Sequence, residues 1–252
     1  MKASEAALRA PVIIGPGRVG RSIAAAAAKS GATVELRGRA DGLKGLEGRL
    51  VLLCVPDSEI APLADSIGGA GTPLLVGHSS GATGLDALAG AGAGAVFSLH
   101  PLQTVPDGAT DLNGCPAAIA GSSQKALDLA GQLAKMTGMR PFVVPEKDRV
   151  IYHAAASIAS NFLVTIEQTA AELLGGISVE DPREILEPLV RRSLDNWIER
   201  GPAALTGPIA RGDEATVEAH RQALAGAGPG MVRFYDALAE RTREIAGQRR
   251  SR

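Results

Sequence analysis

The chain of 252 residues is long enough for one large or two modest domains with a substantial core. A formal net charge of −1 and an aromatic content of 3% argue against a nucleic-acid partner, whether bound by charge or by base stacking. No apolar run is expected to span a membrane, and residues 1–10 lack the apolar core of a signal peptide. The two cysteines are too few for a disulfide framework. We therefore expect a cytoplasmic protein without membrane partners.

A glycine-rich turn near the start is the most informative stretch. The apolar run Val12–Ile14 predicts a strand that stops at Gly15, and the alanine-rich segment 22–29 predicts a helix. This order suits a dinucleotide pyrophosphate. Gly15 allows the tight turn, Gly17 lets the backbone approach the phosphates, and Gly20 lets the helix pack against the strand. The alternative is a glycine turn in some other α/β domain. The expected cofactor-binding residues are Gly15, Pro16, Gly17, Arg18, Val19 and Gly20.

The end of the second predicted strand, 33–37, bears on the choice of cofactor. A dinucleotide fold that prefers NAD places an acidic residue here to accept from the ribose 2′-hydroxyl. This chain has Arg37 and Arg39 instead, and two guanidinium groups suit a 2′-phosphate. We therefore expect NADP. NAD stays open, because Glu35 could reach the ribose if the register slips, and both arginines could simply be solvated.

Three further apolar runs predict buried parallel strands whose ends face the ligand side of the sheet. The run at 50–55 ends in Pro56, and Val55 and Pro56 are expected beside the cofactor, while Asp57 or Ser58 is expected to cap the next helix. The runs at 74–77 and 95–99 each end in a histidine. We expect His78 to contact the cofactor, and His100 with Gln103 to contact the substrate, although such histidines often bond only to loop backbone.

The remaining pattern predicts two domains. Short strands at 115–120 and 141–144 flank a helix at 123–136, and everything beyond residue 146 has helical composition. The predicted fold is a Rossmann-type, mostly parallel α/β domain at 1–146, followed by an all-α domain at 147–252. No Cys/His cluster has zinc spacing and no carboxylate pair is placed for a metal, so no metal is expected.

A long predicted helix at 148–174 is apolar on nearly every face, which is typical of a helix buried in a core or between subunits. His153, Ser157 and Asn161 are spaced to form one polar stripe along it. This stripe is either an edge that faces the substrate or a hydrogen-bonded seam between helices.

Later segments supply one more candidate. A helix is expected at 181–199, Asp213 is placed to cap a helix at 214–225, and a last helix at 231–246 leads to a basic tail at 249–252. Arg211 lies in a loop rich in glycine and proline and could hold a carboxylate, or could be an ordinary surface arginine.

Four segments together resemble a bacterial family with a Rossmann-like amino-terminal domain and a helical carboxyl-terminal domain of unknown function. They are the glycine turn at 15–20, HPLQT at 100–104, HAAASIASN at 153–161 and TGPIARGD at 206–213. More distantly, the layout is similar to ketopantoate reductases and pyrroline-5-carboxylate reductases, which implies NADPH, a helical dimerisation domain and a small carboxylate substrate. Ketopantoate reductases use a lysine and an asparagine at the start of their helical domain. This chain offers His153 and Asn161 there, with Lys147 just before, so the proton donor is open.

The resulting hypothesis is an NADP(H)-dependent oxidoreductase that transfers hydride to or from a C=O or C=N carbon of a small carboxylate. His153 would donate the proton, Ser157 and Asn161 would orient the substrate, and Arg211 would hold its carboxylate. A homodimer through the helical domain is expected. The alternatives are a non-catalytic NADP(H)-binding sensor, an enzyme with another hydride carrier such as a deazaflavin, and the dehydrogenation direction.

Overall fold

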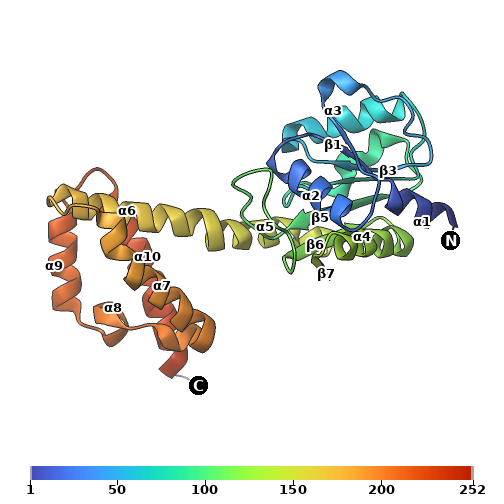
Figure 1. Ribbon diagram of the computed structural model, residues 1–252. Coiled ribbons are helices and arrows are strands. Elements are labelled where there is room, and N and C mark those ends of the chain that lie inside the picture. The colour runs from blue at the N-terminus through green and yellow to red at the C-terminus, as the bar shows by residue number, and fades with distance from the viewer. Residues whose placement is uncertain (1, 251–252) are drawn as a thin grey trace. The chain divides into compact units, whose positions relative to one another are not determined.

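The computed structural model describes residues 2–250, and the chain forms two compact units, Met1–Ser160 and Asn161–Arg252. The first unit is a sheet covered by helices, and the second is entirely helical (Figure 1). The predicted fold class, a Rossmann-type mostly parallel sheet followed by a helical region, is confirmed. The boundary between the units lies later than residue 146, because the helix that starts at Arg149 belongs at first to the sheet unit.

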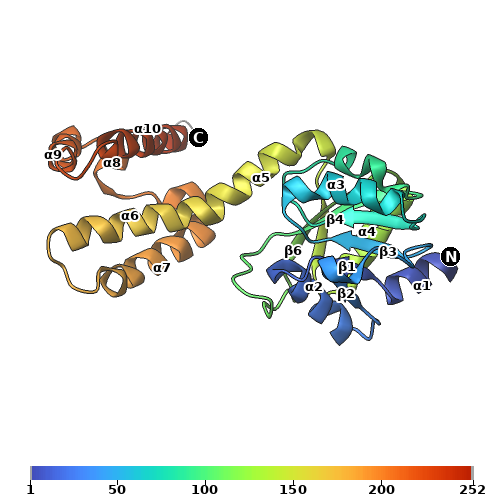
Figure 2. The same cartoon turned by 90° about the horizontal axis from the view of Figure 1, so that it is seen from above.

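Seven strands form one sheet in the order β2-β1-β3-β4-β5-β6-β7, and only the β5–β6 pair is antiparallel. Figure 2 shows β4, β3, β1 and β2 side by side in that order. Because the first five strands are parallel, their carboxyl ends meet at one edge of the sheet, where open α/β folds bind ligands. The strands are β1 (Val12–Ile14), β2 (Glu35–Arg37), β3 (Leu50–Leu53), β4 (Leu75–His78), β5 (Val96–Pro101), β6 (Pro116–Gly121) and β7 (Arg140–Val143).

The helices of the sheet unit lie on both faces of the sheet. Helix α1 was not expected from the sequence, and its Ala7 and Leu8 pack into the core. Short 3₁₀ segments at Arg39–Asp41, Leu85–Ala91 and Glu146–Asp148 complete the connections. The helices are α1 (Lys2–Arg9), α2 (Arg18–Lys29), α3 (Asp57–Gly68), α4 (Gln124–Met136) and α5 (Arg149–Ser157).

The core has two layers because side chains alternate along the strands. Ile13 and Leu52 point into the layer beneath α2 and α4, which also holds Phe97. Ile14 and Leu53 point into the opposite layer, beneath α3. Both faces of the central strands are therefore buried, which explains why these strands are continuous apolar runs in the sequence rather than alternating ones.

The helical unit consists of α6 (Leu163–Gly176), α7 (Pro182–Arg200), α8 (Gly207–Arg211), α9 (Glu214–Leu224) and α10 (Met231–Arg250). Helix α7 continues through Pro188. The predicted cap at Asp213 is confirmed, since its carboxylate accepts from the backbone N–H and the hydroxyl of Thr216. The side chains at 249–250 and the whole of residues 251–252, which make up the predicted basic tail, lie outside the described part of the structure.

The long apolar helix of the sequence is present but is neither regular nor covered. A π-helical turn, Ile158–Phe162, separates α5 from α6. Several of its apolar side chains are open to solvent within one chain, among them Ile151 (70% exposed) and Val164 (68%). The segment Glu146–Gly176 also reaches the length and mean hydropathy of a membrane-spanning helix, contrary to the expectation that no stretch would. Length and hydropathy of this kind are shared by helices that pack between subunits.

Candidate functional site

The glycine turn between β1 and α2 forms a cradle for an anion at the carboxyl edge of the sheet. Gly15 adopts a φ of +109°, and a Cβ there would lie 2.3 Å from the carbonyl oxygen of Cys54. A Cβ on Gly20 would lie 2.0 Å from the carbonyl oxygen of Gly15, so α2 can pack at this distance only with glycine. Gly17, by contrast, faces open space and precedes the first turn of α2, which carries no acidic residue. Its backbone is therefore free to approach an anion at the positive end of the helix.

The arginines after β2 have different roles, and the expectation for Arg37 needs correction. Its side chain is buried, pairs with Glu35 at 2.7 Å, and donates to the carbonyl oxygens of Gly42 and Lys44. Glu35 also pairs with Arg49. Both Arg37 and Glu35 are thus occupied in holding the 38–44 loop, so neither is placed to recognise a ribose or its phosphate.

Arg39 is the exposed member of this pair. Its side chain is 94% exposed, and its nearest acidic partner, Glu59, lies 3.9 Å away. The neighbouring carboxylate of Asp41 accepts a hydrogen bond from the backbone N–H of Gly38, which fixes the turn from which Arg39 projects. Arg39 is therefore the cation at the end of β2 that remains available to a ligand.

The residues that follow β3 have structural roles. Pro56 rather than Asp57 or Ser58 occupies the N-cap position of α3, which corrects that expectation. The carboxylate of Asp57 instead accepts a hydrogen bond of 2.9 Å from the hydroxyl of Ser80, tying α3 to the loop after β4. Burial raises the pKa of the neighbouring Cys54 thiol to about 12, so it stays protonated and is not a nucleophile.

The histidine that ends β4 is a buried core residue, which contradicts the expectation that it contacts the cofactor. The side chain of His78 is fully covered, its Nε2 lies 3.3 Å from the carbonyl oxygen of Gly84, and its Nδ1 has no partner within residues 2–250. Burial, assisted by the nearby positive charge of Arg149, lowers its pKa to about 4. The ring is neutral at physiological pH and supports the loop that follows β4.

The second histidine, on β5, belongs to a compact cluster with the first turns of α5. Nδ1 of His100 lies 2.7 Å from the hydroxyl oxygen of Tyr152, and the His100 and His153 ring centroids are 5.9 Å apart. Both rings pack against Gly81, where a Cβ would lie 2.5 Å from Nδ1 of His153 and 2.9 Å from Nε2 of His100. Phe142 of β7 stacks edge-on against Tyr152. Only glycine at residue 81 lets the two imidazoles approach the loop this closely.

The ionisation of this cluster follows from its burial. Burial, together with the neighbouring His153 and Arg149, lowers the pKa of His100 to about 4. Burial also raises the pKa of Tyr152 to about 12. At neutral pH the pair is therefore an uncharged imidazole beside an intact phenol. Such a pair supplies hydrogen bonds rather than charge.

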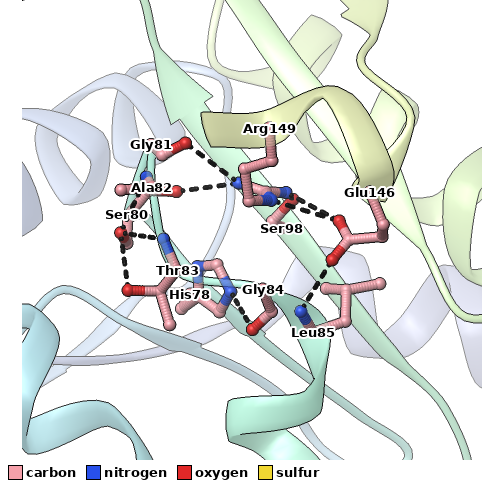
Figure 3. A network of polar contacts seen from close by, with 10 residues as sticks. All are labelled: His78, Ser80, Gly81, Ala82, Thr83, Gly84, Leu85, Ser98, Glu146 and Arg149. Atoms are coloured by element: carbon pink, nitrogen blue, oxygen red, sulfur yellow. Dashed lines mark hydrogen bonds and ion pairs between the residues drawn. The ribbon is translucent and has the colours of Figure 1, made fainter. Parts of the chain in front are cut away.

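A buried arginine at the start of α5 joins the segments around the cluster, and Figure 3 shows its hydrogen bonds and ion pair. Arg149, the first residue of α5, is only 3% exposed. It donates to the carbonyl oxygens of Ser80 and Gly81 and to the hydroxyl of Ser98, and it pairs with Glu146 at 3.1 Å. Glu146 in turn accepts from the backbone N–H of Leu85 at 2.8 Å. One guanidinium group thus joins the loop after β4, strand β5 and the start of α5.

The other predicted site residues lie on several different elements, and Ser157 shares α5 with His153, one helical turn later. Ser157 ends α5, and Asn161 lies in the π-helical turn, so the regular stripe expected from α-helical spacing is interrupted between them. Asn161 and the exposed Arg211 belong to the helical unit, and Gln103 is exposed after β5. No cluster of three or more His, Cys, Asp or Glu residues suited to a metal ion occurs within the described residues.

Two important residues were missed from the sequence. Tyr152 precedes His153 directly, and Arg149 lies one helical turn before it. A tyrosine and an arginine in a segment otherwise rich in alanine were a usable signal. Nothing local, however, indicates that Arg149 points into the sheet unit, because that depends on carbonyl oxygens that lie nearly seventy residues earlier in the chain.

Replacing Arg149 by methionine should destabilise the sheet unit by about 3 kcal/mol, because the carboxylate and the carbonyl oxygens that it serves would lose their buried partner. Urea denaturation followed by circular dichroism measures this loss. The control is Arg9→Met, which removes an exposed pair with Glu5 in the same unit and should change the free energy of unfolding by less than about 0.5 kcal/mol. Equal losses in the two variants would contradict the role given to Arg149.

The stability of the protein should depend on His78 in acid. The folded state holds the pKa of this residue near 4, below the unfolded value near 6.5, so the unfolded chain binds more protons between these values. The contribution of neutral His78 to the stability of the folded state is complete above about pH 6.5 and is lost as the pH falls toward 4. It amounts to about 3 kcal/mol for this shift. We expect thermal unfolding from pH 7 to 4 to show a weaker pH dependence in His78→Gln than in the wild type. The matched variant is His220→Gln, at an exposed position, and an equal change in the two variants would contradict the role given to His78.

Comparison with known proteins places this architecture. No curated protein matches the chain. Among solved structures, a Bacteroides fragilis protein with the provisional name NADP oxidoreductase has a TM-score of 0.77 at 23% identity, over 93% of this chain and 98% of its own. A Thermotoga maritima protein has a TM-score of 0.74 at 22% identity, over 95% and 99%. Plasmodium falciparum pyrroline carboxylate reductase, solved with NADP bound, has a TM-score of 0.58 at 9% identity, over 94% and 99%.

These likenesses at low identity show a shared fold along nearly the whole chain. The family model described as "Domain of unknown function (DUF2520)" matches residues 115–242, which include strand β6, the cluster residues Tyr152 and His153 on α5, and most of the helical unit, but not His100. With half of its length matched, and with the Rossmann-type unit in front, the chain belongs to the DUF2520 family.

Proposed function

We propose that this protein is an NADP(H)-dependent oxidoreductase that transfers hydride between the cofactor and a carbonyl or imine carbon of a small carboxylate. The observation that carries the proposal is the open cradle at Gly17, which lies at the same edge of the sheet as the His100–Tyr152–His153 cluster. In a parallel sheet that edge is where nucleotide and substrate meet. The shared fold with proteins whose names include NADP oxidoreductase and pyrroline carboxylate reductase agrees with this function.

The residues of the first turn fit a dinucleotide. The pyrophosphate would lie against the backbone of Gly15–Gly20, where Gly17 leaves space and the N-terminus of α2 supplies N–H groups without a competing acidic side chain. Pro16, Arg18 and Val19 frame this turn, and Val55 and Pro56 follow the neighbouring strand β3. When bound, the nicotinamide ring supplies or accepts the hydride.

The preference for NADP rests on Arg39. It is the exposed cation at the end of β2, and its guanidinium, which pairs only at 3.9 Å with the half-exposed Glu59, can bind a phosphate through paired hydrogen bonds. Arg37 is not part of this proposal, because the fold already uses its donors. The acidic residue of β2 itself, Glu35, is paired with two arginines and so is not available to a ribose hydroxyl.

The histidine cluster supplies the proton chemistry in this proposal. Nε2 of His153 makes no hydrogen bond within the described residues and is not cut off from solvent, so it can reach a ligand, whereas Nδ1 is buried without a partner. Buried polar atoms without partners are rare and need an explanation, and a functional position supplies one here. We assign proton donation to His153 and substrate contact to His100. Ser157, Asn161, Gln103 and Arg211 remain candidates for orienting the substrate or holding its carboxylate.

The exposed apolar surface supports a homodimer through the helical unit. A groove of about 440 Å³ between α6 and α7 is lined by apolar side chains such as Leu163 and Leu186, and also by charged ones such as Glu167 and Arg191. Surfaces of this kind are rarely left open on a soluble chain, and a lining of both charges can complement a second copy of itself. Sedimentation velocity at micromolar concentration should give the mass of two chains, and a mass of one chain would contradict this part of the proposal.

Thermal shifts with NADPH and NADH should distinguish the role of Gly17, which is to bind the pyrophosphate, from that of Arg39, which is to select the 2′-phosphate. NADPH should raise the melting temperature of the wild type more than NADH does at equal concentration, because only NADPH carries the 2′-phosphate. Gly17→Ala should fold with wild-type stability, since its Cβ meets nothing within 4 Å, but should lose most of the NADPH shift. Arg39→Ala should lose the preference for NADPH and keep the NADH shift, and Arg9→Ala should change neither. Equal shifts with both nucleotides in the wild type would remove the NADP preference.

Turnover distinguishes an enzyme from a binding protein. The protein, NADPH and a panel of small 2-oxo acids and cyclic imines should show loss of absorbance from the reduced nicotinamide with at least one member of the panel. His153→Gln should lower kcat about 100-fold or more at unchanged NADPH affinity. Tight NADPH binding without turnover across the panel would favour a sensor instead. Unchanged turnover in the variant would remove His153 from the mechanism.

A further inference from the structure

The tyrosine in the histidine cluster has no assigned role in the proposed function, although it makes the shortest contact of the cluster. The hydroxyl oxygen of Tyr152 lies 2.7 Å from Nδ1 of His100, with the two rings edge to face at a centroid distance of 5.7 Å. Tyr152 is carried by α5, whose first residue is the buried Arg149. Its hydroxyl is therefore held in position by the fold rather than by a flexible loop.

The direction of this hydrogen bond decides what His100 can do. Within the described residues the Tyr152 hydroxyl has no other acceptor, so donation to Nδ1 is the arrangement that uses its proton. A neutral imidazole whose Nδ1 accepts carries its own proton on Nε2. Because burial and nearby positive charge keep His100 uncharged at neutral pH, this tautomer is the form in which the protein works.

The other nitrogen of His100 is open to a ligand. Nε2 has no hydrogen-bond partner within residues 2–250, and it is not among the polar atoms shut off from solvent. It lies beside Gly81, next to the ring of His153 at a centroid distance of 5.9 Å. A ligand atom that enters here meets an N–H donor on His100, and the carboxylate whose charge acts on this ring is that of Asp57.

We propose that Tyr152 is a positioning residue that fixes His100 as an Nε2–H donor, and that this donor selects a carbonyl oxygen as the reacting group of the substrate. This inference rests on the proposed function and narrows it from carbonyl or imine to carbonyl. A carbonyl oxygen accepts a hydrogen bond and gains negative charge as hydride arrives at its carbon, so a fixed N–H donor stabilises the transition state. An iminium nitrogen is itself a donor and gains nothing from Nε2–H.

The reaction balances with the groups already named. The hydride of reduced nicotinamide forms the new C–H bond at the carbonyl carbon, and the π-electron pair of the C=O bond moves to oxygen. His153, in its imidazolium form, delivers one proton to that oxygen, becomes a neutral imidazole, and regains the proton from solvent. His100 and Tyr152 keep their protons throughout, so neither an imidazolate nor a phenolate is formed.

The tautomer can be measured without substrate or cofactor. Long-range ¹H–¹⁵N NMR of the ¹⁵N-labelled protein at pH 7, with signals assigned by single His→Gln variants, should show His100 protonated at Nε2 and not at Nδ1. In Tyr152→Phe this preference should be lost. The matched control is Tyr235→Phe, which removes a similar hydroxyl 2.9 Å from Nδ1 of the exposed His220 and should leave the His100 signals unchanged. A wild-type proton on Nδ1, or the same His100 tautomer in Tyr152→Phe, overturns the proposal.

Turnover supplies the second test and separates this proposal from the proposed function. The wild type should reduce 2-oxo acids with a higher kcat/KM than cyclic imines, and Tyr152→Phe should lower kcat for the 2-oxo acid by about 10-fold or more at unchanged NADPH affinity. Preferential reduction of imines by the wild type overturns the choice of carbonyl. If NADPH does not bind, the proposed function fails and the selection of a carbonyl fails with it, while the NMR result still decides the role of Tyr152. If Tyr152→Phe does not fold, the wild-type tautomer alone decides that role.

Discussion

The sheet unit depends on one buried guanidinium group. Arg149 brings its positive charge to a position that is almost completely covered, where it is satisfied by two carbonyl oxygens, a hydroxyl and a carboxylate. A buried charge without such partners would cost several kcal/mol, so the surrounding groups must be held in place as long as Arg149 is buried. The loop after β4, strand β5 and the first turn of α5 are consequently constrained as a group. The two side chains that follow Arg149 by three and four residues, Tyr152 and His153, inherit this rigidity.

At two places along the same edge of the sheet, glycine allows a close approach that a side chain would prevent. At one end, Gly15, Gly17 and Gly20 expose backbone where a side chain would clash or cover it. At the other, Gly81 lets two imidazoles approach a loop. In both places the absence of a Cβ brings functional groups into contact distance. The neutral state of His100 follows from the covering that this contact creates, because burial disfavours the charged form of an imidazole.

The architecture could be predicted well from the sequence because the strands and the glycine turn are determined by residues that are close together in the chain. Apolar runs ended by glycine, proline or histidine located the strands within one or two residues, and glycine spacing located the turn. The candidate site was predicted less well because side-chain direction depends on distant partners. Arg37 was expected outside and lies inside, since Glu35 and the carbonyls of a loop five to seven residues later hold it there. His78 was expected to face a ligand and is covered. Whether the histidine is covered depends on the exact residue at which the strand ends, and the composition of the segment does not determine that residue.

The two arginines at the end of β2, Arg37 and Arg39, have different roles. Arg37 maintains the local structure, while Arg39 projects into solvent and contributes nothing to the core. A substitution at residue 39 therefore carries little structural burden. Under the role proposed for Arg39, a change of coenzyme preference needs a substitution at this one surface position and no compensating mutation elsewhere. Evolution of cofactor choice would then be uncoupled from evolution of the scaffold.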